Sequence, residues 1–393
     1  MQKLHLDLSV VSGISDAYLK SSQAISKISG QNLGNLVFRH ALASIIANYF
    51  DFDTVDYQEF AERVKKNHPD LVIISCANWL GTRSQDERSN KFRADLLEPL
   101  KCNVVSFGLG VQAPQYANSV ALGPESKRLA KVLACKAGLL SVRDQLTAKV
   151  LRGMGIDNIC ITGCPSNFIN TRPDLGKAIA RKAELLAQQG LPWAQTRVAI
   201  SEMSGGHKVS GSVLRRMFEV MNSAPSFYIV QSPELLPLVY GESTNIPNVY
   251  TANSGLSIQD CMNRLKSTAL AFSNVEAWLD FSRTCDLSFG MRIHGTMVPL
   301  QAEVPSLMIG HDSRTLGLAH EMCIPGLTPQ AFMALSLEDP LALWQEIFDQ
   351  IQQYDDNRAH LSQVLVGFLS ENNLPATQKL LDLAQSVSIP ATA

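Results

Sequence analysis

The segment DLSFGMRIHGTMVPLQAEVPSLMIG, residues 286–310, contains the unit that decides the fold. It opens with a short apolar run that is typical of a strand and reaches a turn at Gly290. A helical stretch, IHGTMVPLQAE, follows, and a second apolar run, PSLMIG, comes after it. Strand, helix and strand in this order are typical of parallel sheets whose strands are joined by helical crossovers.

The same alternation extends through both halves of the 393-residue chain. The first half has four such apolar runs: DLVIISCA (70–77), CNVVSFG (102–108), AGLLSVR (137–143) and NICITG (158–163). The second half adds three more: TRVAIS (196–201), SFYIVQS (226–232) and NVY (248–250). Helical patterns separate them, as in DQLTAKVLRGMGI, where Asp144 is placed to cap the helix. The sequence therefore predicts an α/β protein with two parallel sheets.

A polar helical stretch separates the two halves and suggests a division into domains. We expect an N-terminal domain over residues 1–170, a connecting helical segment over 171–195 and a C-terminal domain over 196–335. Residues 336–393 are expected to form helices that pack back on both domains. Because open parallel sheets bind ligands at the carboxyl ends of their strands, two such sheets predict a cleft between the domains.

Composition narrows the class of partner. With 34 basic and 36 acidic residues the formal net charge is -2, so neither nucleic acid nor an anionic membrane surface is indicated. The eight cysteines show no CxxC and no zinc spacing, which favours reduced thiols and no metal or cofactor. No apolar run approaches the roughly 20 residues of a membrane span. We expect a cytoplasmic protein without an integral membrane segment.

Charged residues interrupt the apolar segment 286–310, and they form the main site candidate. A buried unpaired charge is costly, so Arg292 and His294 at the edge of apolar runs suggest a role at the cleft. The Arg292 guanidinium can bind phosphate or carboxylate with two hydrogen bonds, and His294 can donate a proton to the same ligand.

The next strand ends in IGHDSRT, which adds a second set of candidates. Asp312 or Ser313 can cap the following helix, while Arg314 or Thr315 in its first turn can meet an anion. The structural alternative is an ion pair between Arg292 and Asp312 that ties two strand ends together, with His294 as a hydrogen-bonded filler.

Three further stretches contribute candidates at expected strand or helix ends. Each has a structural alternative, namely a capped helix, an ordinary loop or a helix cap. The candidate ligand-binding residues are Asn32, Gly34 and Asn35 before a helix, Gly205, Gly206 and His207 after a strand, and Arg143 at another strand end.

Together, NLGN (32–35), SVRDQLTAKVLRGMGI with ITGCPS (141–166), and GMRIHGTMVPLQAEVPSLMIGHDSRT (290–315) resemble the polysaccharide pyruvyl transferase family. The last motif is the most specific. Departures from the family pattern are Asn35 and Cys164, where an acidic residue is frequent, Arg314, where Lys is common, and residues 76–78, which replace a glycine pair.

The resemblance implies two Rossmann-like domains in the glycosyltransferase-B arrangement, with the acceptor on the N-terminal side and the donor on the C-terminal side. It implies transfer of pyruvate from phosphoenolpyruvate to a sugar or a lipid-linked oligosaccharide as a cyclic ketal. Such an enzyme would work in the cytoplasm or peripherally at the inner face of the membrane. The residues fit this chemistry, since arginines can hold the donor's anionic groups and His294 can serve as the general acid beside Arg292.

Two other functions remain open from the sequence. A cleft with Arg and His also suits a glycosyltransferase with a nucleotide-sugar donor. The departures at Asn35 and Cys164 also leave room for a non-catalytic sugar-binding or polysaccharide-assembly protein. Binding of phosphoenolpyruvate, of a nucleotide sugar, or of neither donor distinguishes the three.

Overall fold

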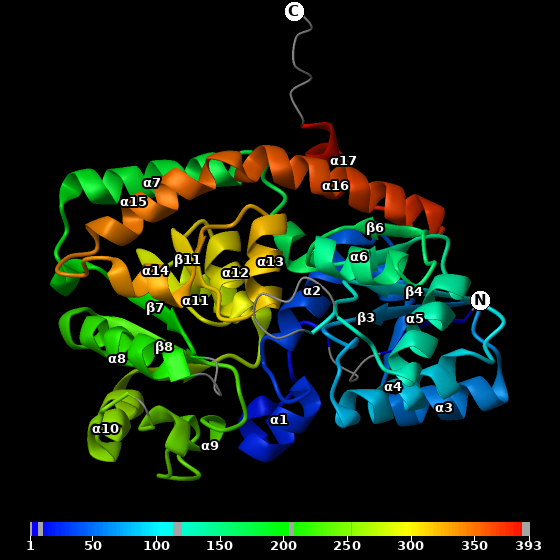
Figure 1. Cartoon of the computed structure of the whole chain (residues 1–393), viewed down its shortest axis with the longest axis horizontal. Helices are drawn as coiled ribbons and strands as arrows, with labels where there is room; N and C mark the ends of the chain where they lie inside the picture. Colours follow the sequence, from blue (N-terminus) through cyan, green and yellow to red (C-terminus); the bar gives the residue numbers. More distant parts are fainter. Residues whose placement is uncertain (1, 7–10, 113–119, 204–207, 253, 387–393) are drawn as a thin grey trace, which may run out of the picture.

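The computed structural model describes residues 2–6, 11–112, 120–203, 208–252 and 254–386, with the backbone alone at 208–210, 313 and 314. Two separate parallel sheets lie on opposite sides of the molecule, with helices around and between them (Figure 1). The predicted α/β class with two Rossmann-like domains is confirmed.

The first sheet has the order β2-β1-β3-β4, and all neighbours are parallel. A parallel pair, β5-β6, adjoins it through a bridge between Leu109 and Val142. In this doubly wound order the chain reverses direction across the sheet between β1 and β3. The strands are β1 (Lys3–Leu6), β2 (Asp53–Val55), β3 (Leu71–Ser75), β4 (Asn103–Phe107), β5 (Leu140–Val142) and β6 (Ile159–Ile161).

Helices connect these strands, and some begin at a side-chain cap, from Ser21, Asp56 and Asp144. Asp144 accepts a hydrogen bond of 2.7 Å from the Thr147 amide, so the predicted cap of α6 is confirmed. The helices of this half are α1 (Ser22–Ser29), α2 (Asn35–Ile45), α3 (Tyr57–Lys66), α4 (Ser84–Leu97), α5 (Pro124–Lys136) and α6 (Gln145–Arg152), with short 3-10 turns η1 (Ala17–Leu19), η2 (Tyr49–Asp51) and η3 (Pro165–Phe168).

The second sheet has the order β12-β11-β10-β7-β8-β9, again with parallel neighbours. This is the strand order of the Rossmann fold, and its reversal point lies between β7 and β10. The strands are β7 (Val198–Ser201), β8 (Ser226–Val230), β9 (Ala269–Ala271), β10 (Leu287–Gly290), β11 (Ser306–Ile309) and β12 (Gly326–Leu327).

One predicted strand of the second half is wrong. The NVY run forms a 3-10 turn, η5 (Asn248–Tyr250), and the strand beside β8 is instead β9. The run is too short for its period to distinguish the two, and the Tyr250 hydroxyl turns inward to a buried carboxylate at Glu202. The helices here are α8 (Lys208–Ser223), α9 (Leu236–Val239), α10 (Ile258–Thr268), α11 (Val275–Ser282), α12 (Ile293–Gln301), α13 (Ser313–Glu321) and α14 (Pro329–Ala334).

Four helices run along one side of the molecule over both sheets (Figure 1). The connecting helix α7 packs against α15 and α16, while α16 also contacts β6 and α15 contacts β11. A short turn, η4, separates α7 from β7, and another, η6, joins α15 to α16. Their bounds are α7 (Leu175–Gln189), η4 (Trp193–Gln195), α15 (Leu341–Gln350), η6 (Ile351–Gln353), α16 (Tyr354–Glu371) and α17 (Gln378–Gln385).

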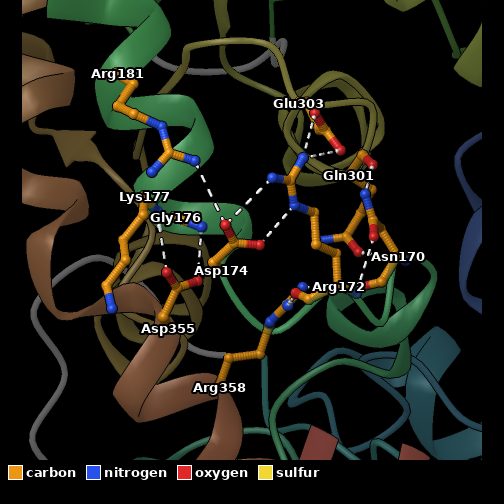
Figure 2. A network of polar contacts seen from close by, with 10 residues as sticks. All are labelled: Asn170, Arg172, Asp174, Gly176, Lys177, Arg181, Gln301, Glu303, Asp355 and Arg358. Carbon is orange, nitrogen blue, oxygen red and sulfur yellow. Dashed lines mark hydrogen bonds and ion pairs between the residues drawn. The ribbon is translucent and has the colours of Figure 1, made fainter. Parts of the chain in front are cut away.

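A polar network fastens the connecting segment to these helices (Figure 2). Arg358 of α16 is fully buried and donates to the carbonyl oxygens of Asn170, at 2.7 Å, and Arg172. The Asp355 carboxylate accepts from the amides of Gly176 and Lys177, at 2.6 and 3.0 Å, and so caps α7 from a different helix. Residues 170–177 are therefore held in place by α16.

Helix α2 of the first half lies between the sheets and contacts α11, α12 and η3. Its apolar side chains share one continuous core with the second sheet, including Leu36, Val37 and Val198. The predicted domain limits at residues 170, 195 and 335 stay predictions. For the site, the consequence is that the first turn of α2 faces the first turn of α12 across the joint between the sheets.

Candidate functional site

A small cavity of about 80 Å³ lies between the carboxyl ends of the two sheets. The first half contributes side chains from α2 and from the ends of β3 and β5, and the second half contributes the segments after β8 and β10 and the start of α13. The lining residues are Asn32, Asn35, Phe38, Ala77, Asn78, Arg143, Gln231, Met291, Arg292, Ile293, His294, Thr315 and Leu318. The cavity therefore brings together six of the candidates, namely Asn32, Asn35, Arg143, Arg292, His294 and Thr315.

Two helices begin at this cavity without a side-chain cap from their N-cap residues. They are α2, whose N-cap is Gly34, and α12, whose N-cap is Arg292. The first amides of a helix lack partners within the helix and carry a partial positive charge. At α2 the amides of Asn35, Leu36 and Val37 already donate to backbone carbonyl oxygens of the preceding turn, so α2 contributes its dipole rather than free donors. The start of α12 is the end that favours an anionic ligand.

Close packing at the second sheet's reversal point depends on two glycines. Gly290 has a φ of 152°, and a Cβ atom there would lie 2.3 Å from the Ser201 carbonyl oxygen. A Cβ atom on Gly295 would lie 2.2 Å from the Ser201 Cβ. Because both positions lack a side chain, β10 and the first turn of α12 can approach the end of β7. This places Arg292 next to the residue that follows β7, Glu202.

Glu202 is buried at the end of β7 and is the ion-pair partner of Arg292, with 3.9 Å between Oε2 and Nη2. Oε2 also accepts from the amides of Gln231 and Ser232, both at 2.9 Å, while Oε1 accepts from the Tyr250 hydroxyl at 3.0 Å. Burial and the nearby carboxylate raise the pKa of the Tyr250 phenol, so it stays a donor.

These contacts leave the guanidinium available to a ligand. Several donors already satisfy the Glu202 carboxylate, and the 3.9 Å separation is longer than a direct hydrogen bond. Among the described residues the buried Nε of Arg292 has no hydrogen-bond partner. The alternative ion pair with Asp312 is wrong, since Arg292 pairs with Glu202 and the Asp312 carboxylate caps α13 by accepting from the Thr315 amide at 2.7 Å.

A second buried donor at the cavity comes from Gln231, which follows β8. Its side-chain nitrogen, Nε2, has no partner within the described part of the chain, although the residue is only 1% exposed. The Gln231 carbonyl oxygen accepts from the Leu33 amide of the first half at 2.9 Å. A Cβ atom on Gly34 would lie 2.5 Å from the Gln231 Oε1, so a larger residue there would displace the Gln231 side chain. Gln231 thus joins both halves at the cavity.

His294 lies in the first turn of α12, nine-tenths or more buried, with its ring 5.5 Å from that of Phe38. Its Nε2 lies 3.7 Å from the Cys164 sulfur, and the Ser166 hydroxyl donates to the same sulfur at 3.1 Å. The imidazole therefore stands between an aromatic ring and a thiol, while it also lines the cavity.

The candidates of the first half are held more tightly by the protein itself. Arg143 donates through Nε to the Gly108 carbonyl oxygen at 2.7 Å and through Nη2 to that of Cys76 at 3.2 Å. The side-chain nitrogen of Asn35, Nδ2, donates to the backbone carbonyl oxygens of Ser29 and Gly30. Asn32 accepts from the Gly34 amide at 2.9 Å and shapes the turn before α2. These residues form the wall of the cavity.

Five of the remaining candidates fall, as whole residues or with their side chains, outside the described part of the chain. Gly205, Gly206 and His207 lie outside the described residues, and Ser313 and Arg314 lie in the first turn of α13 with their side chains outside the described part. Thr315 lines the cavity, and its hydroxyl donates to Asp312 Oδ1 at 2.7 Å. Asp312 also lies 3.7 Å from His311 Nε2.

Sequence reasoning missed Glu202, Gln231, Asn78 and Phe38. Three of them follow a strand directly or within a few residues, which is the signal that could have found them once the strand order was known. Phe38 sits one turn into α2 and looks like an ordinary core residue in the sequence. No cluster of three or more metal-binding side chains occurs in the described ranges, nor does any described helix combine the length and apolarity needed to span a bilayer.

Fold and cavity together define a two-domain α/β protein with an anion-favouring site between its sheets. Residues 32–313 match the model of the polysaccharide pyruvyl transferase family. Since the match spans most of the chain, the protein belongs to this family of transferases. No curated protein matches the sequence.

Three solved structures show how far the similarity of fold extends. The UDP complex of MnaA from S. aureus is 10% identical over 95% of this chain and 99% of that one, with a TM-score of 0.49. A putative UDP-N-acetylglucosamine 2-epimerase from Listeria monocytogenes is 13% identical over 87% of this chain and 82% of that one, with a TM-score of 0.42. The wall teichoic acid polymerase TagF is 10% identical over 86% of this chain and 79% of that one, with a TM-score of 0.40. At these values no ligand or activity is carried over.

Proposed function

We propose that this protein transfers pyruvate from phosphoenolpyruvate to a sugar of a polysaccharide or its precursor as a cyclic ketal. The observation that carries the proposal is the cavity itself. There, two buried donors without a partner among the described residues, Arg292 Nε and Gln231 Nε2, meet the start of α12, which has no side-chain cap from its N-cap residue. Unpaired buried donors are costly, so the site calls for a ligand rich in acceptor oxygens. Phosphoenolpyruvate offers both a phosphate and a carboxylate.

The proposed reaction needs a proton donor, which is His294, and two hydroxyl groups of the acceptor sugar. His294 delivers a proton to the methylene carbon of the donor, which becomes a methyl group and leaves positive charge on the neighbouring carbon. A sugar hydroxyl forms a bond to that carbon and loses its proton, and phosphate leaves as its carbon–oxygen bond breaks. A second hydroxyl closes the ketal and loses its own proton. The two hydroxyl protons restore His294 and balance the released phosphate.

Arg292 and the start of α12 hold the anionic groups through this sequence. Their donors lie in a cavity walled by protein, where interactions with charge are stronger than in water.

Ligand protection tests the donor. The melting temperature of the full chain is measured with phosphoenolpyruvate, with inorganic phosphate and with a panel of nucleotide sugars at equal concentrations. A ligand that binds only the folded state stabilises it by about 2.7 kcal/mol at a hundredfold excess over Kd. We expect phosphoenolpyruvate to raise the melting temperature most. Protection by a nucleotide sugar alone would reject the proposed donor, and protection by none would favour the non-catalytic alternative.

A further inference from the structure

The thiol of Cys164 touches the imidazole of His294 across the joint between the two halves of the chain. The two residues are 130 positions apart, and their Sγ and Nε2 atoms are separated by 3.7 Å. Cys164 follows β6 in the first half, whereas His294 opens α12 in the second. Both side chains are buried, but only His294 lines the cavity. The thiol therefore lies behind the imidazole as seen from a ligand.

The surroundings fix the sulfur atom from several sides. Ser166 is fully buried, and its hydroxyl donates to Sγ at 3.1 Å. The backbone amide of Cys164 donates to the thioether sulfur of Met322, which lies at the end of α13, at 3.5 Å. On the imidazole, the ring of Phe38 lies at 5.5 Å. Rotation of the His294 ring would thus disturb its contacts with Phe38 and with Cys164, which Ser166 and Met322 hold in place.

Hydrogen-bond directions give the contact a chemical meaning. Since the sulfur already accepts from Ser166, its own S–H is free to act as the donor toward Nε2. A donor at Nε2 places the hydrogen of a neutral ring on Nδ1. In the neutral ring, the chain from Ser166 through Cys164 to His294 then selects one tautomer and one orientation. In the protonated ring, which is the acid, Nε2–H donates to the sulfur instead, so the same contact holds the same orientation. A side chain without a donor at position 164 would remove that selection.

We propose that Cys164 is a positioning residue for His294: its thiol fixes the tautomer of the neutral ring and, as an acceptor, the orientation in which the protonated ring faces the donor. The inference rests on the proposed function for its effect on turnover, but the effect on the ring itself is independent of any substrate. Cys164 does not line the cavity and acts only through His294.

The test compares Cys164→Ala with Cys164→Ser, which keeps a hydrogen-bond donor, and with Cys160→Ala as a matched control. Cys160 is a half-buried thiol on β6 that lies 3.8 Å from the Leu140 carbonyl oxygen, away from the cavity. Nitrogen-15 labelling of histidine reports the ring tautomer by NMR, with the His294 signals assigned from their loss in His294→Gln. Melting temperatures establish that each variant is folded.

We expect Cys164→Ala to lose the tautomer preference of His294 and Cys164→Ser to keep it, with no change in Cys160→Ala. Turnover in Cys164→Ala should fall about tenfold or more, as for a misoriented acid, while KM for phosphoenolpyruvate stays within about twofold. Cys164→Ser should recover part of that loss. If Cys164→Ala does not fold, Cys164→Val and Cys164→Ser supply the same comparison.

Unchanged His294 signals in folded Cys164→Ala would overturn the proposal, and so would a loss confined to KM. If the wild-type protein transfers no pyruvate, the proposed function fails instead. The NMR comparison then still decides whether Cys164 positions the ring. The two failures are therefore distinguishable.

Discussion

Arg292 shows how one side chain can be anchored and still serve a ligand. Its anchor, Glu202, lies 3.9 Å away and takes shorter hydrogen bonds from two backbone amides and a tyrosine hydroxyl. If Glu202 fully neutralised the charge of Arg292, the guanidinium would have little attraction for an anion. Here the carboxylate orients the guanidinium while much of its own charge is satisfied elsewhere.

Replacing Arg292 with Ala is therefore expected to weaken phosphoenolpyruvate binding by about 1.5 to 3 kcal/mol, the scale of a hydrogen bond to a charged group. Titration calorimetry on the folded variant measures this change. Arg283→Ala is the matched control. Arg283 is an exposed arginine at the C-terminal end of α11, and its Nη1 lies 3.9 Å from Oδ1 of Asp280. Equal affinities in wild type and Arg292→Ala would remove Arg292 from the site.

His294 separates chemistry from binding. His294→Gln keeps polarity and much of the volume but cannot donate a proton in the same way, so turnover should fall on the order of 10² to 10⁴ while donor affinity is retained. His320→Gln is the control, since His320 is an exposed histidine in the last turn of α13. A variant that melts several degrees lower and keeps its turnover per folded molecule would show that His294 is structural.

At the residue scale, the sequence indicated Arg292 and the neighbouring His294 as site candidates but not their partners. Arg292 and His294 stand out because charge interrupts an apolar run. Glu202 and Gln231 could not be found in this way. Their roles depend on β7 lying beside both β10 and β8, a neighbourhood that no local pattern specifies.

At the scale of single elements, α7 owes its start to α16. Arg358 satisfies two carbonyl oxygens of the connecting segment, and Asp355 caps the first turn of α7 (Figure 2). Sequence periodicity predicted a helix here and long helices at the C-terminus. It could not predict that one supplies the cap of the other, because Asp355 and Gly176 are 179 residues apart and the cap needs no local motif.

Arg358→Met keeps most of the apolar stem but leaves the carbonyl oxygens of Asn170 and Arg172 without their buried donor. We expect a loss of about 2 to 4 kcal/mol in the free energy of unfolding, measured by urea denaturation. Arg181→Met is the control, since Arg181 is an exposed residue of α7 whose ion pair with Asp174 contributes about 0 to 1 kcal/mol. Similar losses in both variants would contradict the importance assigned to burial.

His5 gives the first sheet a dependence on pH. It is buried in β1 between the hydroxyls of Tyr49 and Ser75, and burial, together with the charge of Arg39, lowers its pKa from 6.5 to about 3. The unfolded chain therefore binds the proton first as the pH falls. Stability from this group is complete above pH 6.5 and is lost progressively toward pH 3.

The slope due to His5 should approach about 1.4 kcal/mol per pH unit within that window. Urea unfolding of His5→Gln at several pH values should show a shallower slope than the wild type, while the exposed control His68→Gln leaves it unchanged. Parallel curves for wild type and His5→Gln would show that His5 is already charged or that its burial has no energetic effect.

At the scale of the whole molecule, function depends on the joint between two sheets. The net charge of -2 gives no general attraction for an anion, so the positive character of the cavity is local. It rests on Arg292 and the start of α12 at the reversal point of the second sheet. Arg143 follows β5, away from the first sheet's reversal point, and donates to backbone carbonyl oxygens. The alternation of strands and helices was sufficient to predict two such sheets. Their contact through α2 follows from a core shared by both halves, which the sequence pattern did not reveal.

Mass spectrometry of the reaction product tests the central claim most directly. The full chain is incubated with phosphoenolpyruvate and a panel of sugars and lipid-linked oligosaccharides, with His294→Gln in parallel. We predict that an acceptor gains the mass of pyruvate less one water, that one phosphate is released per product, and that the variant forms far less product. Transfer of a sugar from a nucleotide-sugar donor, with no pyruvylated product from phosphoenolpyruvate, would contradict the proposed function.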